Sequence, residues 1–422
     1  MKQEIKERIE QINNGIIPEG YKKTSLGIIP IGWDICKFNY MFSRLMRKNK
    51  ENNPNVLTIS AQYGLISQTE FFNKDVSSED KSNYYLLFKG DFAYNKSYSS
   101  GYPFGTIKRL SLYEKGVVSP LYICMQKTDR NLCPDYYLQY FEAGLFNREI
   151  KAIAQEGARN HGLLNISVDD FFNTNVVFPP YHNQEKIAEI LSAQDKVIEL
   201  KEKLIEQKRL YKKYLMQQLF YKEHPNWAHI TLSDILTESK EKNKAQDKEI
   251  CSVSVRNGVI SQIEHLGKTM SADDTSNYKV VNYGEVVYTK SPTGDFPYGI
   301  VKQSLLPSPV AVSPLYAVYT PCDINLGYLI HEYFMYSSNV EKYLFPIVNI
   351  GAKHTMNISN NTFISRSIYL PSEKQEAEKI ANVFRNFNRE IELLEQELEQ
   401  EKKKKKALMQ LLLTGIVRVK ND

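Results

Sequence analysis

The pattern of apolar positions predicts two long helices that form a coiled coil. In the C-terminal part of the chain, apolar residues recur with alternating steps of four and three, which is the spacing of a coiled-coil seam. This seam comprises Ile380, Phe384, Phe387, Ile391, Leu394, Leu398, Glu401, Lys405, Leu408 and Leu412. Subtracting 193 gives a more polar seam in the centre of the chain: Ile187, Leu191, Gln194, Ile198, Lys201, Ile205, Lys208, Lys212, Leu215 and Leu219. Neither stretch contains Pro or Gly, so each is predicted to be one continuous helix of about 38 residues, roughly 57 Å long.

The chain is an internal tandem duplication. With an offset of 194, Trp33 aligns with Trp227, and no gap is needed as far as Tyr122 and Tyr316. A register held over about 90 residues does not arise by chance, and the period is far longer than the ~20–50 residues of solenoid repeats. The matched residues include Gly64/Gly258, Gly90/Gly284, Tyr94/Tyr288, Lys96/Lys290, Gly105/Gly299, Lys108/Lys302 and Ser119-Pro120-Leu121-Tyr122/Ser313-Pro314-Leu315-Tyr316.

Each copy combines a globular domain with one of the long helices. The globular parts are rich in Tyr, Phe, Val and Ile and are broken by Gly, Pro, Asn and Ser. This pattern predicts short strands, such as Asn55 to Ser60, Val117 to Met125 and Val286 to Tyr288, beside helices at Pro134 to Ala154 and Leu326 to Tyr343.

We therefore predict an α+β protein in which two similar mixed α/β domains are separated by two long helices in a pseudo-twofold arrangement. Each domain joins its helix by a short connection, whereas the chain between the helices must traverse a whole domain, which favours an antiparallel over a parallel coiled coil. The predicted boundaries are residues 1–32 for an N-terminal lead segment, 33–181 for the first domain, 182–222 for the central helix, 223–372 for the second domain, 373–416 for the distal helix and 417–422 for the C-terminal tail.

Composition and charge exclude several protein classes. No stretch approaches about 18 consecutive apolar residues, and Met1 to Glu10 alternates Lys, Glu and Arg, so neither a membrane span nor a signal peptide is predicted. The 5 cysteines lie far apart without a CxxC pair, which is typical of a cytoplasmic protein with reduced thiols. The formal net charge of +5 is too small for nucleic-acid binding by bulk attraction alone. Any such binding should therefore rely on local patches and depend strongly on salt.

No catalytic motif emerges. Phe178-Pro179-Pro180-Tyr181 resembles the Asn/Asp/Ser-Pro-Pro-Tyr/Phe loop of amino-methyltransferases, but Phe178 cannot accept a hydrogen bond from a target amine, and a proline-capped exit into the central helix is the simpler interpretation. The 7 histidines form no HxxxH or HExxH pair, and the phosphate-binding GxxxxGK[ST] and nucleophilic GxSxG motifs are absent. Adjacent acidic pairs such as Asp169-Asp170 would diverge on a strand or a helix. The sequence therefore predicts a binding protein with no catalytic or metal-binding residues.

Two similar domains at a fixed distance suit two related features of one partner, of which two half-sites on DNA are a natural case. Reading DNA needs donors and acceptors on loops, and cations for the phosphates. Cations present in both copies suit phosphates, and side chains that differ between the copies suit different bases. The candidates lie on three pairs of loops: Gln62 and Tyr63 with Arg256 and Asn257; Lys96, Ser97 and Tyr98 with Lys290, Ser291 and Thr293; and Arg159, Asn160 and His161 with Lys353, His354 and Thr355.

Each candidate also has a plain structural interpretation. The loops could be ordinary solvated turns, and the run from Lys402 to Lys406 is most simply a solvated helix face. The shared tyrosines are expected to pack in the core rather than stack on bases: Tyr94, Tyr288, Tyr122 and Tyr316.

The order of these features resembles the specificity subunit of a type I restriction-modification system over nearly the whole chain. The resemblance rests on the two Ser-Pro-Leu-Tyr blocks, on Gly157-Ala158-Arg159 followed by Asn165-Ile166-Ser167, and on the exit FPPYHNQEKIAEIL from Phe178 to Leu191. The helix ends KKYLMQQLF (Lys212 to Phe220) and KKALMQLLLTG (Lys405 to Gly415) also fit. No single motif is diagnostic, but their order and duplication are specific.

The resemblance implies that each domain is a target recognition domain that reads one half of a bipartite target in double-stranded DNA. The helices would set the spacing of the halves and dock two methyltransferase subunits. S-adenosylmethionine, ATP and Mg would then bind to the methyltransferase and restriction (translocase/endonuclease) subunits, and no cofactor to this chain.

Two alternatives stay open. One is a coiled-coil scaffold with duplicated protein-binding domains, and the other is a single-chain enzyme fused from recognition parts, against which the missing catalytic motifs argue. The polar positions Lys201, Lys208 and Lys212 in the central seam depart from a regular coiled coil. They imply either that the lysine stems reach outward to water or that partner subunits stabilise the helices.

Overall fold

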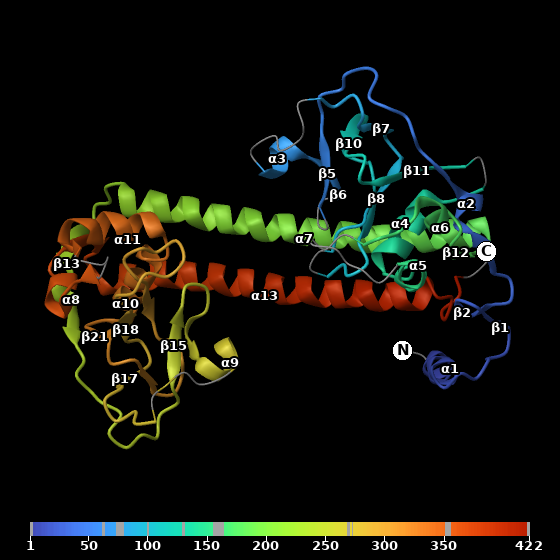
Figure 1. Ribbon diagram of the computed structural model, residues 1–422. Helices are drawn as coiled ribbons and strands as arrows, with labels where there is room; N and C mark the ends of the chain where they lie inside the picture. The colour runs from blue at the N-terminus through green and yellow to red at the C-terminus, as the bar shows by residue number, and fades with distance from the viewer. Residues whose placement is uncertain are drawn as a thin grey trace. The chain divides into compact units, whose positions relative to one another are not determined.

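The computed structural model contains two compact units, which are described separately. It describes residues 3–60, 64–72, 80–98, 101–128, 131–154, 164–267, 271, 273–350 and 356–419. The first unit comprises residues 1–202 and 397–422, and the second comprises residues 203–396. Two long helices, α7 (Tyr181–Tyr221, 41 residues) and α13 (Lys374–Leu412, 39 residues), each contribute one segment to each unit (Figure 1). The prediction of two long continuous helices is confirmed.

The first unit contains the following elements besides its helix segments: α1 (Gln3–Asn13), β1 (Tyr21–Thr24), β2 (Gly27–Pro30), β3 (Asp34–Lys37), α2 (Phe38–Met41), β4 (Phe42–Arg44), β5 (Leu57–Ser60), β6 (Gly64–Ser67), α3 (Gln68–Phe72), β7 (Tyr85–Phe88), β8 (Phe92–Asn95), β9 (Thr106–Arg109), β10 (Lys115–Val118), β11 (Ile123–Lys127), α4 (Pro134–Glu142), α5 (Asn147–Ile153), α6 (Val168–Phe172) and β12 (Asn175–Phe178).

The second unit contains a matching series: β13 (Trp227–Thr231), α8 (Leu232–Ile235), β14 (Leu236–Glu238), β15 (Cys251–Ser254), β16 (Gly258–Ser261), α9 (Gln262–Leu266), β17 (Lys279–Val281), β18 (Val286–Tyr288), β19 (Val301–Gln303), β20 (Val310–Val312), β21 (Ala317–Pro321), α10 (Ile324–Tyr333), α11 (Ser337–Leu344), η1 (Phe345–Ile347), β22 (Asn349–Ile350), β23 (Met356–Asn357), α12 (Asn360–Phe363) and β24 (Ser367–Pro371).

The two units repeat one sheet topology. A four-stranded antiparallel sheet has the order β4-β11-β8-β9 in the first unit and β14-β21-β18-β19 in the second. The strand pairs β3–β12, β5–β6 and β7–β10 likewise correspond to β13–β24, β15–β16 and β17–β20. The predicted fold class, two similar mixed α/β domains with two long helices, is confirmed.

The core of each unit contains the same stacked aromatic pair. Tyr94 stacks on Phe171 with ring centroids 5.1 Å apart, and Tyr288 stacks on Phe363 at 4.4 Å. Both tyrosines are fully buried, whereas Tyr122 and Tyr316 are half-buried against the edge of the core. The expectation that the shared tyrosines pack inside the protein is therefore confirmed for Tyr94 and Tyr288.

Three predicted elements are interrupted in the structure. The helix predicted from Pro134 to Ala154 is divided into α4 and α5 because Gly144 adopts the left-handed conformation, with φ 71°, between them. The helix predicted from Leu326 to Tyr343 is likewise divided into α10 and α11. The strand predicted from Val117 to Met125 is two strands, β10 and β11, separated by a turn at Ser119 to Tyr122.

Each globular part packs on the start of one long helix and the end of the other. In the first unit, Ile187, Ala188 and Leu191 of α7 share a core with Met409, Leu412 and Leu413 near the end of α13. In the second unit the repeat-equivalent residues share a core in the same way: Ala381 and Phe384 of α13 with Met216 and Phe220 of α7. The repeat therefore extends from the sequence to the contacts that hold each domain.

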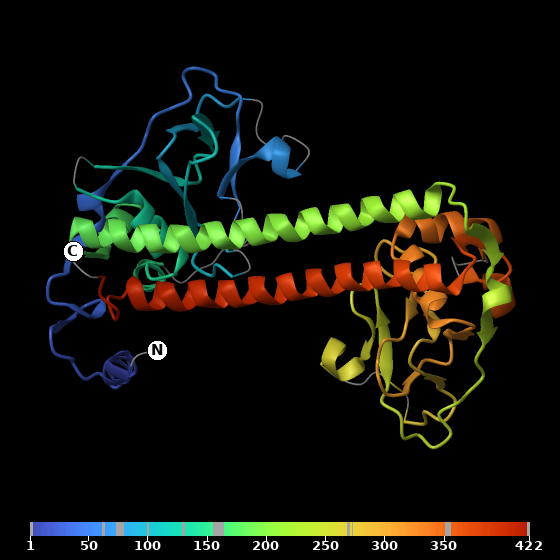
Figure 2. The same cartoon turned by 180° about the vertical axis from the view of Figure 1, so that it is seen from behind.

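The helix segments run antiparallel within each unit, and they lie side by side in both views (Figures 1 and 2). In the first unit Lys201 Nζ lies 2.7 Å from Glu397 Oε2, and Lys405 Nζ lies 2.5 Å from Asp195 Oδ1. In the second unit Lys208 Nζ lies 2.8 Å from Glu390 Oε1. The seam lysines Lys201 and Lys208 are thus ion-paired across the helix pair, which explains the polar central seam.

A three-residue polar node joins each domain to its helix pair, with the roles of two residues exchanged between the units. In the first unit, Asp195 of α7 accepts a hydrogen bond from Gln139 Nε2 at 2.7 Å and pairs with Lys405. The equivalent residues of the second unit are Asn388, Glu332 and Lys212. There Lys212 Nζ lies 2.7 Å from Glu332 Oε2 and donates to Asn388 Oδ1 at 2.6 Å. Each node holds one ammonium, one carboxylate and one amide, but the carboxylate lies on the helix in the first unit and on the domain in the second.

A segment near the start of the chain contacts a segment near its end in the first unit. The hydroxyl of Tyr21 donates to the carbonyl of Gly415 at 2.8 Å, and Arg8 Nη1 donates to the carbonyl of Ile416 at 2.7 Å. In the second unit the corresponding junction between helix and domain is covalent, from Tyr221 to Trp227. In the first unit, hydrogen bonds from the lead segment therefore connect the end of α13 to the domain, whereas in the second unit the backbone itself connects the end of α7 to the domain. Across the part of the chain that is described, no helix has the length and apolar character needed to cross a membrane.

The exchanged node yields a testable prediction. Glu332→Gln should lower the free energy of unfolding of the second unit by about 3 kcal/mol, because it leaves the buried Lys212 ammonium without a carboxylate. Adding Asn388→Asp should restore most of this loss, because it recreates the arrangement of the first unit. The chain has 2 tryptophans, one in each unit, so urea unfolding followed by Trp227 fluorescence in a Trp33→Phe background reports on the second unit.

Asn388→Asp alone serves as the control, since it places a second carboxylate beside Glu332 and should also destabilise the second unit. A double variant no more stable than Glu332→Gln would show that the two nodes are not equivalent.

Candidate nucleic-acid interface

The loop after β8 holds the first described group of predicted site residues. Ser97 N–H donates to the side chain of Asn95 at 3.0 Å, and the N–H of Leu164 donates to the carbonyl of Lys96 at 3.0 Å. Tyr98 is 65% exposed. The strand end therefore presents Lys96, held by Leu164, together with the exposed Tyr98.

The equivalent loop after β18 is held differently. Lys290 adopts a left-handed conformation, with φ 58°, and its ammonium donates to Asn360 Oδ1. Asn360 in turn donates to Glu238 Oε1 at 2.5 Å. Ser291 is exposed, and its carbonyl accepts a hydrogen bond from the Thr293 hydroxyl at 3.3 Å. Lys290 is thus tethered to α12, a contact that sequence spacing does not predict.

Both loops close through a repeated glycine. A Cβ at Gly105 would lie 2.3 Å from the carbonyl oxygen of Asn95, and one at Gly299 would lie 2.9 Å from the backbone nitrogen of Lys290. Both glycines have positive φ, 77° and 86°. Only glycine fits so close to the backbone in this conformation, so the pair Gly105/Gly299 fixes the shape of the two loops.

Of the remaining predicted site residues, the structure describes Arg256 and Asn257, and these are not joined to the loop after β18. Arg256 and Asn257 are exposed at the turn between β15 and β16, where Asn257 N–H donates to Ser254 Oγ at 3.4 Å. Within the described residues, no hydrogen bond or ion pair links them to Lys290, Ser291 or Thr293. Several other predicted residues lie outside the described residues: Gln62, Tyr63, Arg159, Asn160, His161, Lys353, His354 and Thr355.

Further cations that sequence reasoning missed surround the two strand ends. In the first unit, Lys96 and Arg44 line one small cavity of about 60 Å³, and Lys48 Nζ lies 4.2 Å from the centre of the Tyr85 ring, which lines the same cavity. In the second unit, burial lowers the pKa of Lys290, and the neighbouring Lys279 lowers it further. Burial also lowers the pKa of Lys279. Arg44 corresponds to Glu238 and Lys279 to Tyr85 in the other copy, so the repeat does not mark these two cations in the sequence.

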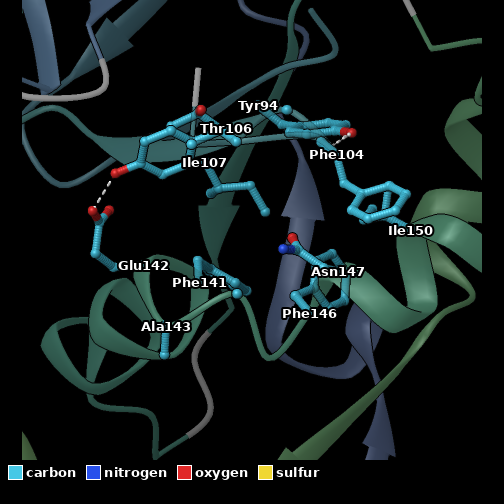
Figure 3. Close-up of a pocket in the computed structure, with 14 residues that line it drawn as sticks. Tyr94, Phe104, Thr106, Ile107, Phe141, Glu142, Ala143, Phe146, Asn147 and Ile150 are labelled. Atoms are coloured by element: carbon cyan, nitrogen blue, oxygen red, sulfur yellow. Dashed lines mark hydrogen bonds between the residues drawn. The ribbon is translucent and has the colours of Figure 1, made fainter. Parts of the chain in front are cut away.

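A cavity of about 390 Å³ lies beneath the first loop, between it and helices α4 and α5 (Figure 3). At one side the Tyr102 hydroxyl donates to Glu142 Oε1 at 2.5 Å, and Lys108 Nζ lies 2.5 Å from Glu142 Oε2. Burial, reinforced by the hydrogen bond to Glu142, raises the pKa of Tyr102. These three side chains satisfy one another, so this wall of the cavity anchors the loop to α4.

The second unit replaces this anchor by apolar residues but keeps the lysine. Phe296 and Met335 stand at the positions of Tyr102 and Glu142, and Lys302 stands at the position of Lys108. Lys302 is almost completely buried, and its Nζ lies 2.5 Å from Met335 Sδ. Burial lowers the pKa of Lys302 to about 8.

The two lysines should respond oppositely to replacement. Lys302→Met should raise the free energy of unfolding of the second unit by about 1–3 kcal/mol at pH 7, since it removes a buried charge. Below pH 8 Lys302 is protonated in both states, whereas between about 8 and 10.5 the folded state releases the proton that the unfolded state retains. The wild type therefore gains stability over that interval, and the advantage of Lys302→Met should shrink as the pH rises.

Lys108→Met is the matched control, because it leaves Glu142 without its ammonium and should destabilise the first unit by about 2 kcal/mol. Urea unfolding at pH 7 and pH 10, with Trp33 or Trp227 as the single reporter, measures both effects. An advantage of Lys302→Met that is independent of pH would contradict the titration of Lys302.

Comparison with known proteins places these features in context. Residues 33–207 match the family described as type I restriction modification DNA specificity domain. The chain is 23% identical over 430 residues to the putative type I restriction enzyme MjaX specificity subunit of Methanocaldococcus jannaschii, covering 95% of this chain and 97% of that protein. It is 26% identical over 335 residues to the MjaVIII specificity subunit of the same organism, covering 74% and 76%.

Solved structures show the same fold. The S subunit of a type I restriction-modification system from M. genitalium aligns with a TM-score of 0.51 at 14% identity, over 92% of this chain and 97% of that one. A chain from a structure of type I restriction-modification complex assembly and conformational transition aligns with a TM-score of 0.52 at 13% identity, over 92% and 99%.

Proposed function

We propose that this chain, which matches the type I restriction modification DNA specificity domain over residues 33–207, is the specificity subunit of such a system, and that each of its two domains reads one half of a bipartite target in double-stranded DNA. The observation that carries this proposal is the duplicated strand end after β8 and β18. The same position holds Lys96 in one copy and Lys290 in the other, inside loops closed by the same glycine.

The residues around these lysines divide into shared and divergent positions. Lys96/Lys290 and Lys48/Lys242 keep their charge in both copies, which suits contacts to phosphates. Arg44 is replaced by Glu238, and Tyr85 by Lys279. A change from a donor to an acceptor at the same place alters which base edges can be bound. Two half-sites of different sequence would require this combination.

We assign the spacing of the half-sites and the docking of other subunits to the long helices. In both units α7 leaves apolar side chains exposed with heptad spacing, on a face adjacent to the one that packs on α13: Ile190, Val197, Leu200, Leu204, Tyr211, Tyr214 and Tyr221. The equivalent positions of α13 include the charged residues Glu390, Glu397 and Lys404. Exposed aromatic and aliphatic side chains in a row are typical of protein interfaces. The stripe supports docking of methyltransferase subunits on α7.

Under this proposal the chemistry resides in the other subunits. Among the described residues no group of His, Cys, Asp and Glu could hold a metal ion. S-adenosylmethionine would bind to the methyltransferase subunits, and ATP and Mg to the restriction subunits. The specificity subunit would contribute sequence recognition and position.

The proposal is tested by mapping methylated bases. Genomic DNA from cells that express this chain with the methyltransferase subunits of its system should carry methylation at one bipartite sequence with a fixed unspecified spacer. One heptad inserted in α7 after Lys201 and another in α13 before Glu397 keeps the seam in frame, because these residues pair. Seven residues add about 10 Å, so the spacer should lengthen by about three base pairs.

Methylation that does not depend on this chain, or a chain that captures other proteins but no duplex in gel-shift assays, would favour the scaffold alternative. Methylation by the purified chain alone would favour a single-chain enzyme. An unchanged spacer in the heptad variant would contradict the role of the helices in spacing.

The shared lysines make a separate prediction. If Lys96 and Lys290 each contact a phosphate, Lys96→Ala and Lys290→Ala should each weaken binding to target and non-target duplexes by a similar factor. Each should also reduce the slope of log K against log salt concentration by about 1. Fluorescence anisotropy of the assembled methyltransferase complex across a salt series measures both quantities. The control is Lys213→Ala, because Lys213 is an exposed lysine on the second-unit segment of α7. Equal salt slopes for all three variants would exclude Lys96 and Lys290 from the phosphate contacts.

A further inference from the structure

A turn with identical sequence and geometry occurs once in each unit. Ser119-Pro120-Leu121-Tyr122 connects β10 to β11, and Ser313-Pro314-Leu315-Tyr316 connects β20 to β21. In both turns the serine hydroxyl accepts a hydrogen bond from the leucine N–H at 3.3 Å. The tyrosine N–H donates to the serine carbonyl at 3.1 Å in both. Proline and these two hydrogen bonds make the turn rigid.

The turn presents its apolar tip to solvent. Leu121 is 63% exposed and Leu315 is 73% exposed, and the preceding prolines are exposed as well. The serine and tyrosine at the ends of the turn are half-buried in both copies. Outside the long helices, exposed leucines such as Leu112 are not repeated in this way: Leu112 is 59% exposed, whereas its equivalent, Leu306, packs against the core. The exposed leucine is therefore retained at this turn in both repeats although nearby side chains differ.

The surroundings of the tip are cationic in the first unit. Leu121 and Pro120 line the same small cavity as Lys96 and Arg44. Among the described residues that line it, two are cationic and none is acidic. Lys48, which lies against Tyr85 at the same cavity, adds a third positive charge.

The second unit reaches a similar environment with different residues. Lys279 Nζ donates to the carbonyl of Tyr316 at 2.6 Å, which attaches an ammonium directly to the turn. Two further lysines lie close to Lys279: Lys242 contributes to lowering the pKa of Lys279, and Lys279 contributes to lowering the pKa of Lys290. Glu238 is the acidic residue in this group, and its Oε1 is occupied by the hydrogen bond from Asn360. An apolar tip surrounded by cations is complementary to the base stack and phosphates of a nucleic acid.

We propose that the Pro-Leu tips of both turns insert between base steps of the bound DNA, one in each half-site. Leucine and proline are among the side chains that proteins insert between base pairs, partly unstacking them and kinking the duplex. This contact reads no particular base, which accounts for its identity in two domains that recognise different sequences. The inference rests on the proposed function and adds to it a deformation of the DNA that both half-sites share.

The test uses the complex of the chain with its methyltransferase subunits on a duplex that contains the mapped target. 2-Aminopurine replaces adenines other than the methylated ones, and its fluorescence rises when a base step opens. Leu121→Ala should abolish the rise in one half-site only, and Leu315→Ala in the other only. Each should weaken target binding about tenfold, as expected for loss of one buried leucine side chain, with the salt slope unchanged.

Leu112→Ala and Leu305→Ala are matched controls, since both replace exposed leucines of the same domains outside the turn. Wild-type complex that binds the target without any fluorescence rise, or turn variants that bind like the controls, would overturn the insertion while leaving DNA reading intact. Turn variants that lose methyltransferase subunits but keep the fluorescence rise would show that the tips contact protein instead. A wild-type complex that does not bind the mapped duplex would instead refute the proposed function.

Discussion

The structure depends on one packing constraint: each domain needs two helix segments that are far apart in the sequence. The start of one long helix is attached to the domain by its own chain, and the end of the other helix completes the same core. Leu191 and Leu412 fill these roles in the first unit, and Phe384 and Met216 fill them in the second. A helix that changed its pairing or its register would therefore expose part of a domain core. This coupling makes the helix pair a structural part of both domains rather than a tether between them.

The polar residues of the central seam follow from the same constraint. Leucines alone would hold the helices together but would tolerate shifts by a heptad. Ion pairs such as Lys201–Glu397 and Lys208–Glu390 satisfy only one register. The nodes at Asp195 and Asn388 go further, because each matches the domain that precedes its own helix. The carboxylate of Asp195 meets the amide of Gln139, and the amide of Asn388 meets the carboxylate of Glu332. A domain moved onto the other helix would bring either two carboxylates or none. A domain that is exchanged for another one should therefore be moved together with the first part of the long helix that follows it.

The sequence was sufficient for the architecture, because duplication and heptad spacing are properties of the order of residues. The repeat offset predicted two similar domains, and the seam predicted two long helices. Local breaks were harder: Gly144 and Ser119-Pro120 are ordinary turn residues that interrupt elements which apolar spacing alone joins together. The candidate interface was predictable at Lys96 and Lys290, where the repeat preserves a charge. It was not predictable at Lys279 or Asn360, because their roles arise from strands and helices that meet only in the folded domain.

The modest net charge of the chain is compatible with the proposed reading of DNA by two similar domains. Under the proposed function, a net charge of +5 over 422 residues would give only weak attraction for DNA in general, so non-target sequences would be held poorly. Two linked readers would recover affinity at the correct site, since binding of the first raises the effective concentration of the second. This gain would require that both half-sites have the right sequence and spacing, so affinity itself would become selective. Contacts that are the same in both domains would then set the binding strength of each half, and the divergent positions such as Arg44 and Glu238 would set its sequence.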